Sequence, residues 1–147
     1  MASNAAVDGA QRGQTGQTGL MEVPLTIHSA SGEHRFTVEV AATPEQQETG
    51  LMFRTALAPD RGMIFPYSPP QDVAFWMKNT LIPLDMVFIR EDGTIARIVT
   101  ARPLDETTVS SGEPVATVLE IGGGRAAQLG IREGDLASWP PLPVAAP

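Results

Sequence analysis

The chain has 147 residues and a mass of 15.6 kDa, a length that suits one ordinary domain with tails. Acidic residues outnumber basic residues by 17 to 10, and the net charge of -7 disfavours binding to phosphate backbones. We therefore expect no nucleic-acid partner. Because the sequence has no cysteine, disulfides, thiolate nucleophiles and cysteine-ligated zinc are excluded.

Three segments differ in composition. Residues 1–20 are rich in Gly, Gln, Ala and Thr, which predicts a disordered leader or a cloning remnant. Residues 21–138 alternate apolar and polar positions and are predicted to form a single β-rich domain. Residues 139–147 contain four prolines, which favour an extended tail. No apolar run reaches the roughly 18 residues that a membrane span needs, so we expect no transmembrane segment.

The first predicted elements are a hairpin and a helix. Apolar residues alternate with polar ones over residues 23–27 and 36–40, on either side of a turn at residues 31–32. Thr43 followed by Pro44 and Gln46 has the spacing of a capped helix start, which predicts a short helix over residues 44–52.

Strands dominate the rest of the chain. Five strand-like runs follow the helix, separated by proline pairs or by the turn at residues 91–93: GMIFPYS, DVAFWMKN, LDMVFIR, TIARIVTAR and VATVLEI. A second short helix is predicted at RAAQL, closed by Gly130, before a final strand near DLASW. The predicted class is mainly β (α+β), a compact antiparallel β-barrel-like domain with one or two short helices.

Asp85 is the one charged residue in the apolar run LDMVFI, and we expect it to be buried. A buried carboxylate needs a partner, and Arg54, Lys78 or Asn79 could supply one. Two interpretations stay open. Asp85 either ties down the turn at Pro83 or takes part in ligand binding or catalysis.

Strand alternation places Trp76 and Lys78 on one face of the run DVAFWMKN, and Phe75 and Met77 on the other. The second pair is predicted to be core. An aromatic ring beside a cation suits stacking on a sugar ring or holding an anionic group. The alternative is a tryptophan packed under a loop, with Lys78 reaching into water.

Several stretches, taken together, resemble a known prokaryotic family. GLMFR, GMIF, FWMKNT, IPLDMVFI, VLEI and GIREGD have the order and spacing of the family called domain of unknown function 192, over roughly residues 36–136. The family's signature positions fall on Gly50, Leu51, Met52, Arg54, Gly62, Met63, Phe65, Trp76, Met77, Asn79, Thr80, Pro83, Leu84, Asp85 and Glu120. This resemblance implies a largely antiparallel β-barrel-like domain with a short helix. Members frequently follow an export signal, so it also implies an exported or periplasmic protein; it brings no established activity.

Two weaker signals are set aside. The stretch GGGRAA satisfies the pattern G-x-G-x-x-A of dinucleotide sites, but the helix that follows is too short for such a unit. His28 and His34 flank a turn without a third ligand nearby, which makes a poor metal site. We therefore expect no metal and no cofactor.

The leading hypothesis is a domain that binds a small polar ligand, such as a saccharide or a cell-envelope fragment, without turning it over. Aromatic, cationic, amide and carboxylate groups crowd into ten residues of an apolar strand pair, which is typical of a ligand site. In this hypothesis Trp76 stacks on the ligand. Arg54 and Lys78 contact its acceptors or negative groups, and Asn79 and Asp85 orient it.

Two other classes are kept open. Asp85 and Glu120 both interrupt apolar strands, where burial would raise a carboxyl pKa, so a small hydrolase could use them as an acid and base pair. Against this, Glu120 could simply pair with an arginine such as Arg54 or Arg97. The third class is an interaction domain similar to PDZ domains, because GGGRAAQLGIREGD resembles their helix and turn.

Overall fold

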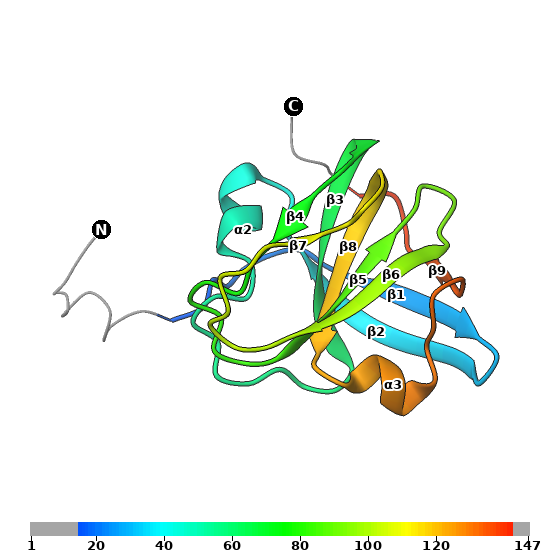
Figure 1. The fold of residues 1–147 in the computed structure, drawn as a ribbon, viewed down its shortest axis with the longest axis horizontal. Coiled ribbons are helices and arrows are strands. Elements are labelled where there is room, and N and C mark those ends of the chain that lie inside the picture. Colours follow the sequence, from blue (N-terminus) through cyan, green and yellow to red (C-terminus); the bar gives the residue numbers. More distant parts are fainter. Residues whose placement is uncertain (1–14, 143–147) are drawn as a thin grey trace, which may run out of the picture.

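The structure is a computed structural model that describes residues 15–142 (Figure 1). Within that range the chain is mainly β, as predicted, with nine strands and two short helices. In chain order they are β1 (Glu22–Ser29), β2 (Gly32–Val40), α2 (Pro44–Thr49), β3 (Arg61–Gln71), β4 (Ala74–Phe75), β5 (Leu84–Ile89), β6 (Ile95–Ala101), β7 (Val109–Ser110), β8 (Val115–Gly122), α3 (Arg125–Leu129) and β9 (Leu136–Ser138).

Seven strands form one curled sheet in the order β6-β5-β8-β3-β2-β1-β9, while β4 and β7 form a separate two-stranded sheet. Neighbouring strands of the large sheet are antiparallel, with one exception: β2 and β3 pair in parallel. The connection between these two strands carries α2, as parallel neighbours require a crossover rather than a tight turn. In Figure 1 the sheet curls strongly, with α2 and α3 outside it.

The two ends of the sheet meet. The segment that leads into β9 hydrogen-bonds to the first residue of β6: Ile95 N donates to Asp135 O and Gly134 N donates to Ile95 O, both at 2.8 Å. An isolated bridge between Thr94 and Leu136 continues this contact. The curl is therefore nearly closed, which leaves little unpaired edge on this side.

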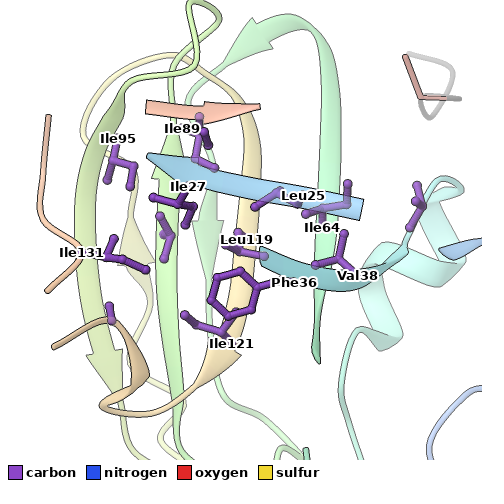
Figure 2. Close-up of a cluster of buried hydrophobic side chains, with 14 residues drawn as sticks. Leu25, Ile27, Phe36, Val38, Ile64, Ile89, Ile95, Leu119, Ile121 and Ile131 are labelled. Carbon is purple, nitrogen blue, oxygen red and sulfur yellow. The ribbon is translucent and has the colours of Figure 1, made fainter. Parts of the chain in front are cut away.

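The main core fills the inside of the curl. Side chains from both halves of the sheet point toward one another there, among them Ile27 of β1 and Ile95 of β6 (Figure 2). Both are essentially inaccessible to solvent. Burial of these branched apolar side chains supplies the main stabilisation of the sheet.

A second core lies on the outer face of β3, β8 and β5. Because side chains alternate along a strand, Val87 points into the curl whereas its neighbour Met86 points outward, and each belongs to a different buried cluster. The outward cluster is completed by Leu51 and Met77 from segments that cross this face. Strands β5 and β8 are thus apolar on both faces, and a polar side chain on either face is buried.

Local predictions agree with the structure at several elements. The hairpin forms as β1 and β2, and α3 spans the five predicted residues RAAQL and ends at Gly130. Helix α2 begins at Pro44 as predicted but ends at Thr49. The predicted strand DVAFWMKN is extended only over Ala74–Phe75, and β7 was not predicted.

Residues of both predicted end segments contact the β-rich domain. Residues 15–20 belong to the predicted leader, yet Gln17 hydrogen-bonds to the backbone of α2. At the other end, Trp139 and Leu142 of the predicted tail pack against the main core. Residues 1–14 and 143–147, which hold the rest of both predicted segments, lie outside the described residues. No helix in the described part of the chain is long and apolar enough to span a membrane.

Candidate functional site

A cavity of about 360 Å³ lies between α2, the outer face of β3 and β8, and the segment 74–80. We call it the α2 cavity. Four aromatic side chains and two carboxyl groups give it its chemical character: Phe65, Tyr67, Phe75, Trp76, Glu48 and Glu120. The cavity combines apolar ring surface with a few polar groups, the usual composition of a small-molecule site.

Helix α2 forms one wall of the α2 cavity, and its ends are fixed by local contacts. The Thr43 hydroxyl accepts a hydrogen bond from Gln46 N, and the Gln46 side chain accepts from Thr43 N. This capping box satisfies amides that the first turn leaves unpaired. At the other end Gly50 lies against the ring of Phe65, where an added Cβ would already be at 3.4 Å. The absence of a side chain at Gly50 therefore lets the end of the helix pack directly against the Phe65 ring.

Glu120 lies in β8 with its carboxyl group inside the outer core. Strand register places it between Met63 of β3 and Met86 of β5, two apolar neighbours. The residue is 4% exposed, and no hydrogen bond or ion pair from residues 15–142 reaches its carboxyl group. Burial therefore raises the pKa of Glu120 to about 8. An unpartnered buried carboxyl group is unusual in a folded protein and marks the α2 cavity as a candidate site.

Aromatic rings surround the space in front of Glu120. Phe65 and Phe75 pack edge to face, with ring centroids 5.0 Å apart. Tyr67, the one tyrosine of the chain, is largely buried, and burial together with the nearby charge of Glu120 raises the pKa of its phenol. The ring of Trp76 is 44% exposed and lies at the mouth. The cavity thus combines buried and half-buried aromatic rings with one exposed aromatic residue.

The segment that carries Trp76 is held by backbone contacts between three loops. Phe53, Asn79 and Leu104 have positive φ values of 67°, 56° and 64°, conformations that cost energy for residues other than glycine. Phe53 N donates to Asn79 O at 2.9 Å, and Leu104 N donates to Thr80 O at 3.0 Å. This strained junction fixes the turn at Lys78 and Asn79 beside the α2 cavity.

Lys78 lies next to the cavity rather than in its lining. Its Nζ is 5.3 Å from the centroid of the Trp76 ring, a cation–π arrangement. The structure therefore brings Trp76 and Lys78 together, although both lie after the end of β4 rather than in a strand. Asn79 follows in the turn and is half-buried, and its backbone makes the contact with Phe53 described above.

Arg54 does not reach the α2 cavity. Its guanidinium group binds both carboxylate oxygens of Glu39, at 2.5 Å and 2.9 Å, and also donates to Gln17 O. These residues border a separate, more open hollow near Arg61. The geometry is that of a bidentate ion pair that joins the loop after α2 to β2.

Asp85 faces the inside of the curl and is fully satisfied by the protein. Its carboxylate accepts hydrogen bonds from the Thr100 hydroxyl at 2.6 Å and from Gly124 N and Ala126 N, each at 2.9 Å. None of the three partners expected from the sequence, Arg54, Lys78 and Asn79, is among these donors. Asp85 instead joins the start of α3 to β5, so the amides of the last glycine of GGG and of Ala126 bind a carboxylate of the chain itself.

Two further expectations for Glu120 do not hold. It was expected to pair with Arg54 or Arg97, but Arg54 binds Glu39 and Arg97 donates to the carbonyl of Ser110. The pairing of Met86 with Glu120 and of Asp85 with Ile121 places the two carboxyl groups on opposite faces of the sheet. They do not share a cleft.

Of the five residues expected to bind ligand, Trp76 alone lines the α2 cavity, and Lys78 and Asn79 border it. Sequence reasoning missed Tyr67 and the whole α2 wall. A polar aromatic residue inside the apolar run GMIFPYS was a signal for Tyr67. The α2 residues gave no signal of their own, because their role depends on a contact made by tertiary folding.

The chain belongs to the family DUF192, described as "Uncharacterized ACR", which matches residues 26–139. A protein of unknown function from Novosphingobium aromaticivorans is 47% identical, with a TM-score of 0.81, over 83% of this chain and 88% of that chain. A protein from Sinorhizobium meliloti, described as a candidate transcription regulator, is 44% identical with a TM-score of 0.80, over 84% of this chain and 98% of that chain. No curated protein matches this chain.

Proposed function

We propose that this protein binds a small polar ligand in the α2 cavity. The observation that carries the proposal is the carboxyl group of Glu120, which is buried, has no partner among the described residues and lines a cavity with Trp76 at its mouth. A ligand that hydrogen-bonds Glu120 would supply the missing partner, and its apolar face would stack on Trp76.

The residues to which we assign ligand binding differ from the five that were expected from the sequence. Trp76 keeps its stacking role, and Glu120 and Tyr67 supply polar contacts from the interior. Lys78 and Asn79 stay near the mouth. Arg54 and Asp85 are assigned to structure, because each already has charged or hydrogen-bonded partners in the protein.

No observation favours the two other classes to the same degree. A hydrolase that uses a carboxyl pair needs both groups at one substrate, whereas Asp85 and Glu120 face opposite sides of the sheet. A domain similar to PDZ domains would add a peptide strand to a free sheet edge. At the β6 edge, Ile95 already bonds to residues 134 and 135, and Ile98 N donates to the Glu133 carboxylate.

A thermal-shift screen tests the proposal. The chain is heated with saccharides, cell-wall fragments, amino compounds and peptides, and a ligand at a hundred times its dissociation constant should add about 2.7 kcal/mol of stability, several degrees in midpoint. Trp76→Ala should abolish the shift. Leu81→Ala is the matched control, because Leu81 is equally exposed at 44% but does not line the cavity. A shift that survives Trp76→Ala and Glu120→Gln would place binding elsewhere.

A further inference from the structure

We propose that the ligand of the α2 cavity is a small organic cation, an alkylammonium group held between aromatic rings with the Glu120 carboxylate as its counter-charge. This inference rests on the proposed function and deepens it by naming the ligand's chemical class. Three properties of the cavity carry it: the sign of its charges, its aromatic lining and the isolation of Glu120.

The ionisable side chains that line the α2 cavity are two carboxyl groups and the phenol of Tyr67. Glu120 lies at its base and Glu48 of α2 at its exposed rim, and no lysine, arginine or histidine belongs to the lining. Three arginines of the described residues form ion pairs with carboxylates outside this lining. Arg54 binds Glu39, Arg61 binds Glu22, and Arg90 binds Glu113. A cationic ligand would therefore be attracted by the Glu48 carboxylate and by Glu120 once that group is ionised, whereas an anionic ligand would be repelled.

The aromatic lining suits the same kind of ligand. The chain has five Phe, two Trp and one Tyr, and four of these eight side chains line this single cavity. The face of an aromatic ring carries partial negative charge and attracts ammonium groups, most strongly for tryptophan and when water is excluded. Several rings around one space form the cage by which proteins bind quaternary ammonium ligands. Trp76 already shows this affinity, because Lys78 Nζ lies 5.3 Å from its centroid.

The lack of a positive charge among the described residues around Glu120 favours a cation over a neutral polar ligand. An ionised carboxylate in a dry site is costly unless a positive charge or several donors satisfy it. From the elements packed around Glu120 come the neutral phenol of Tyr67 and the rim carboxylate of Glu48, with Met63 and Met86 alongside. None of these groups supplies a positive charge. An ammonium ligand would supply it and would shift Glu120 from its protonated to its ionised form.

A matched pair of ligands tests the proposal on the unmodified chain. Choline and 3,3-dimethylbutanol have nearly the same shape, but choline has a quaternary nitrogen where the alcohol has carbon. Isothermal titration near neutral pH should show choline binding at least tenfold more tightly, a difference of about 1.4 kcal/mol. Repeating the titration in two buffers of different ionisation enthalpy should reveal proton release, because Glu120 is mostly protonated without ligand and ionised with it.

Two variants sharpen the test. Glu120→Gln should weaken choline at least tenfold and abolish the proton release, provided that its thermal unfolding stays cooperative. Lys78→Gln removes a positive charge beside Trp76 and should strengthen choline binding two- to threefold. Weaker binding in this second variant would contradict a cationic ligand, because it would show Lys78 to be a partner of the ligand's acceptors.

The outcomes separate this inference from the proposed function. Equal affinity for choline and its neutral analogue would overturn the cation proposal while leaving a ligand cavity in place. The same holds for a saccharide that binds through Trp76 but is indifferent to Glu120→Gln. Failure of choline together with every class in the thermal-shift screen would overturn both.

Discussion

Asp85 and Glu120 lie in neighbouring hydrogen-bonded strands, yet their carboxyl groups face opposite sides of the same sheet. Inside the curl, Asp85 accepts three hydrogen bonds from the protein, while on the outer face Glu120 accepts none from the described residues. Both are buried to a similar degree, at 1% and 4% exposure. The difference lies in their partners, so we assign Asp85 to stability and Glu120 to ligand binding.

Replacing Asp85 should destabilise the fold strongly. Asp85→Ala leaves the amides of Gly124 and Ala126 without their acceptor in a buried site, and the loss should be about 3 kcal/mol or more. Asp85→Asn keeps one acceptor oxygen and should lose less. Urea unfolding followed by circular dichroism measures both. Asp72→Ala, at an exposed position, is the control and should stay within about 0.5 kcal/mol of wild type.

Glu120 should make the protein less stable as pH rises. Its pKa is about 8 in the folded chain against 4.5 unfolded, so the folded state binds the extra proton between these values. Stability should therefore be unaffected below about pH 4.5, fall progressively up to about pH 8, and then level off. The total loss is on the order of 5 kcal/mol.

Glu120→Leu should remove that slope, and the variant should be more stable than wild type at pH 8 but not at pH 4. Denaturant midpoints across this range give the comparison. Glu48→Gln changes an exposed carboxyl group of the same cavity and should leave the slope unchanged. A flat profile for the wild-type protein would mean that the Glu120 carboxyl group has a partner in solution.

Elements set by nearby residues could be predicted from the sequence. The α2 start depends on Thr43, Pro44 and Gln46, all within four residues, and α3 ends at Gly130 in a left-handed conformation that glycine adopts readily. Strand alternation also identified Phe75 and Met77 as core, and Met77 is 1% exposed. Such features depend on short-range sterics and hydrogen bonds, which the local sequence determines.

Partners that lie far apart in the chain could not be predicted in this way. Arg54 binds Glu39 across the α2 connection, and Asp85 binds the amide of Ala126, 41 residues later. The Arg54 pairing depends on the connection between the parallel strands β2 and β3, and the Asp85 pairing depends on β5 lying beside β8, the strand that leads into α3. The α2 cavity has the same origin, because Glu120 meets Trp76 only once β8 and the segment after β4 pack together.

Arg54 should matter for stability and not for ligand binding. The Arg54 and Glu39 side chains are only 18% and 11% exposed, so Arg54→Met would leave a mostly buried carboxylate unpaired and cost about 2 to 3 kcal/mol. Glu39→Met combined with it should recover part of that loss, as a double-mutant cycle would show. Choline affinity should not change. A large drop in choline affinity with little change in stability would indicate that Arg54 contacts the ligand.

The contact between Gln17 and α2 should hold the cavity wall in place. The Gln17 amide donates to Gln46 O at 3.0 Å and to Gly50 O at 2.9 Å, two carbonyls at the end of a helix that has no basic residue in its last turn. Gln46 O also accepts from Gly50 N, so Gly50 O is the carbonyl that depends on Gln17, and the two hydrogen bonds should contribute about 1 kcal/mol together.

Gln17→Ala should therefore increase local opening of the last turn of α2 about fivefold, the factor that 1 kcal/mol represents. Amide hydrogen exchange of Gly50, whose N–H donates to Gln46 O within that turn, measures the opening directly. Thr18→Ala alters an exposed neighbour in the same segment and should leave the exchange rate as it was. If the exchange rate of Gly50 were the same in both variants, residues 15–20 would not stabilise α2. The position of α2 would then depend on the capping box and on the contact with Phe65 alone.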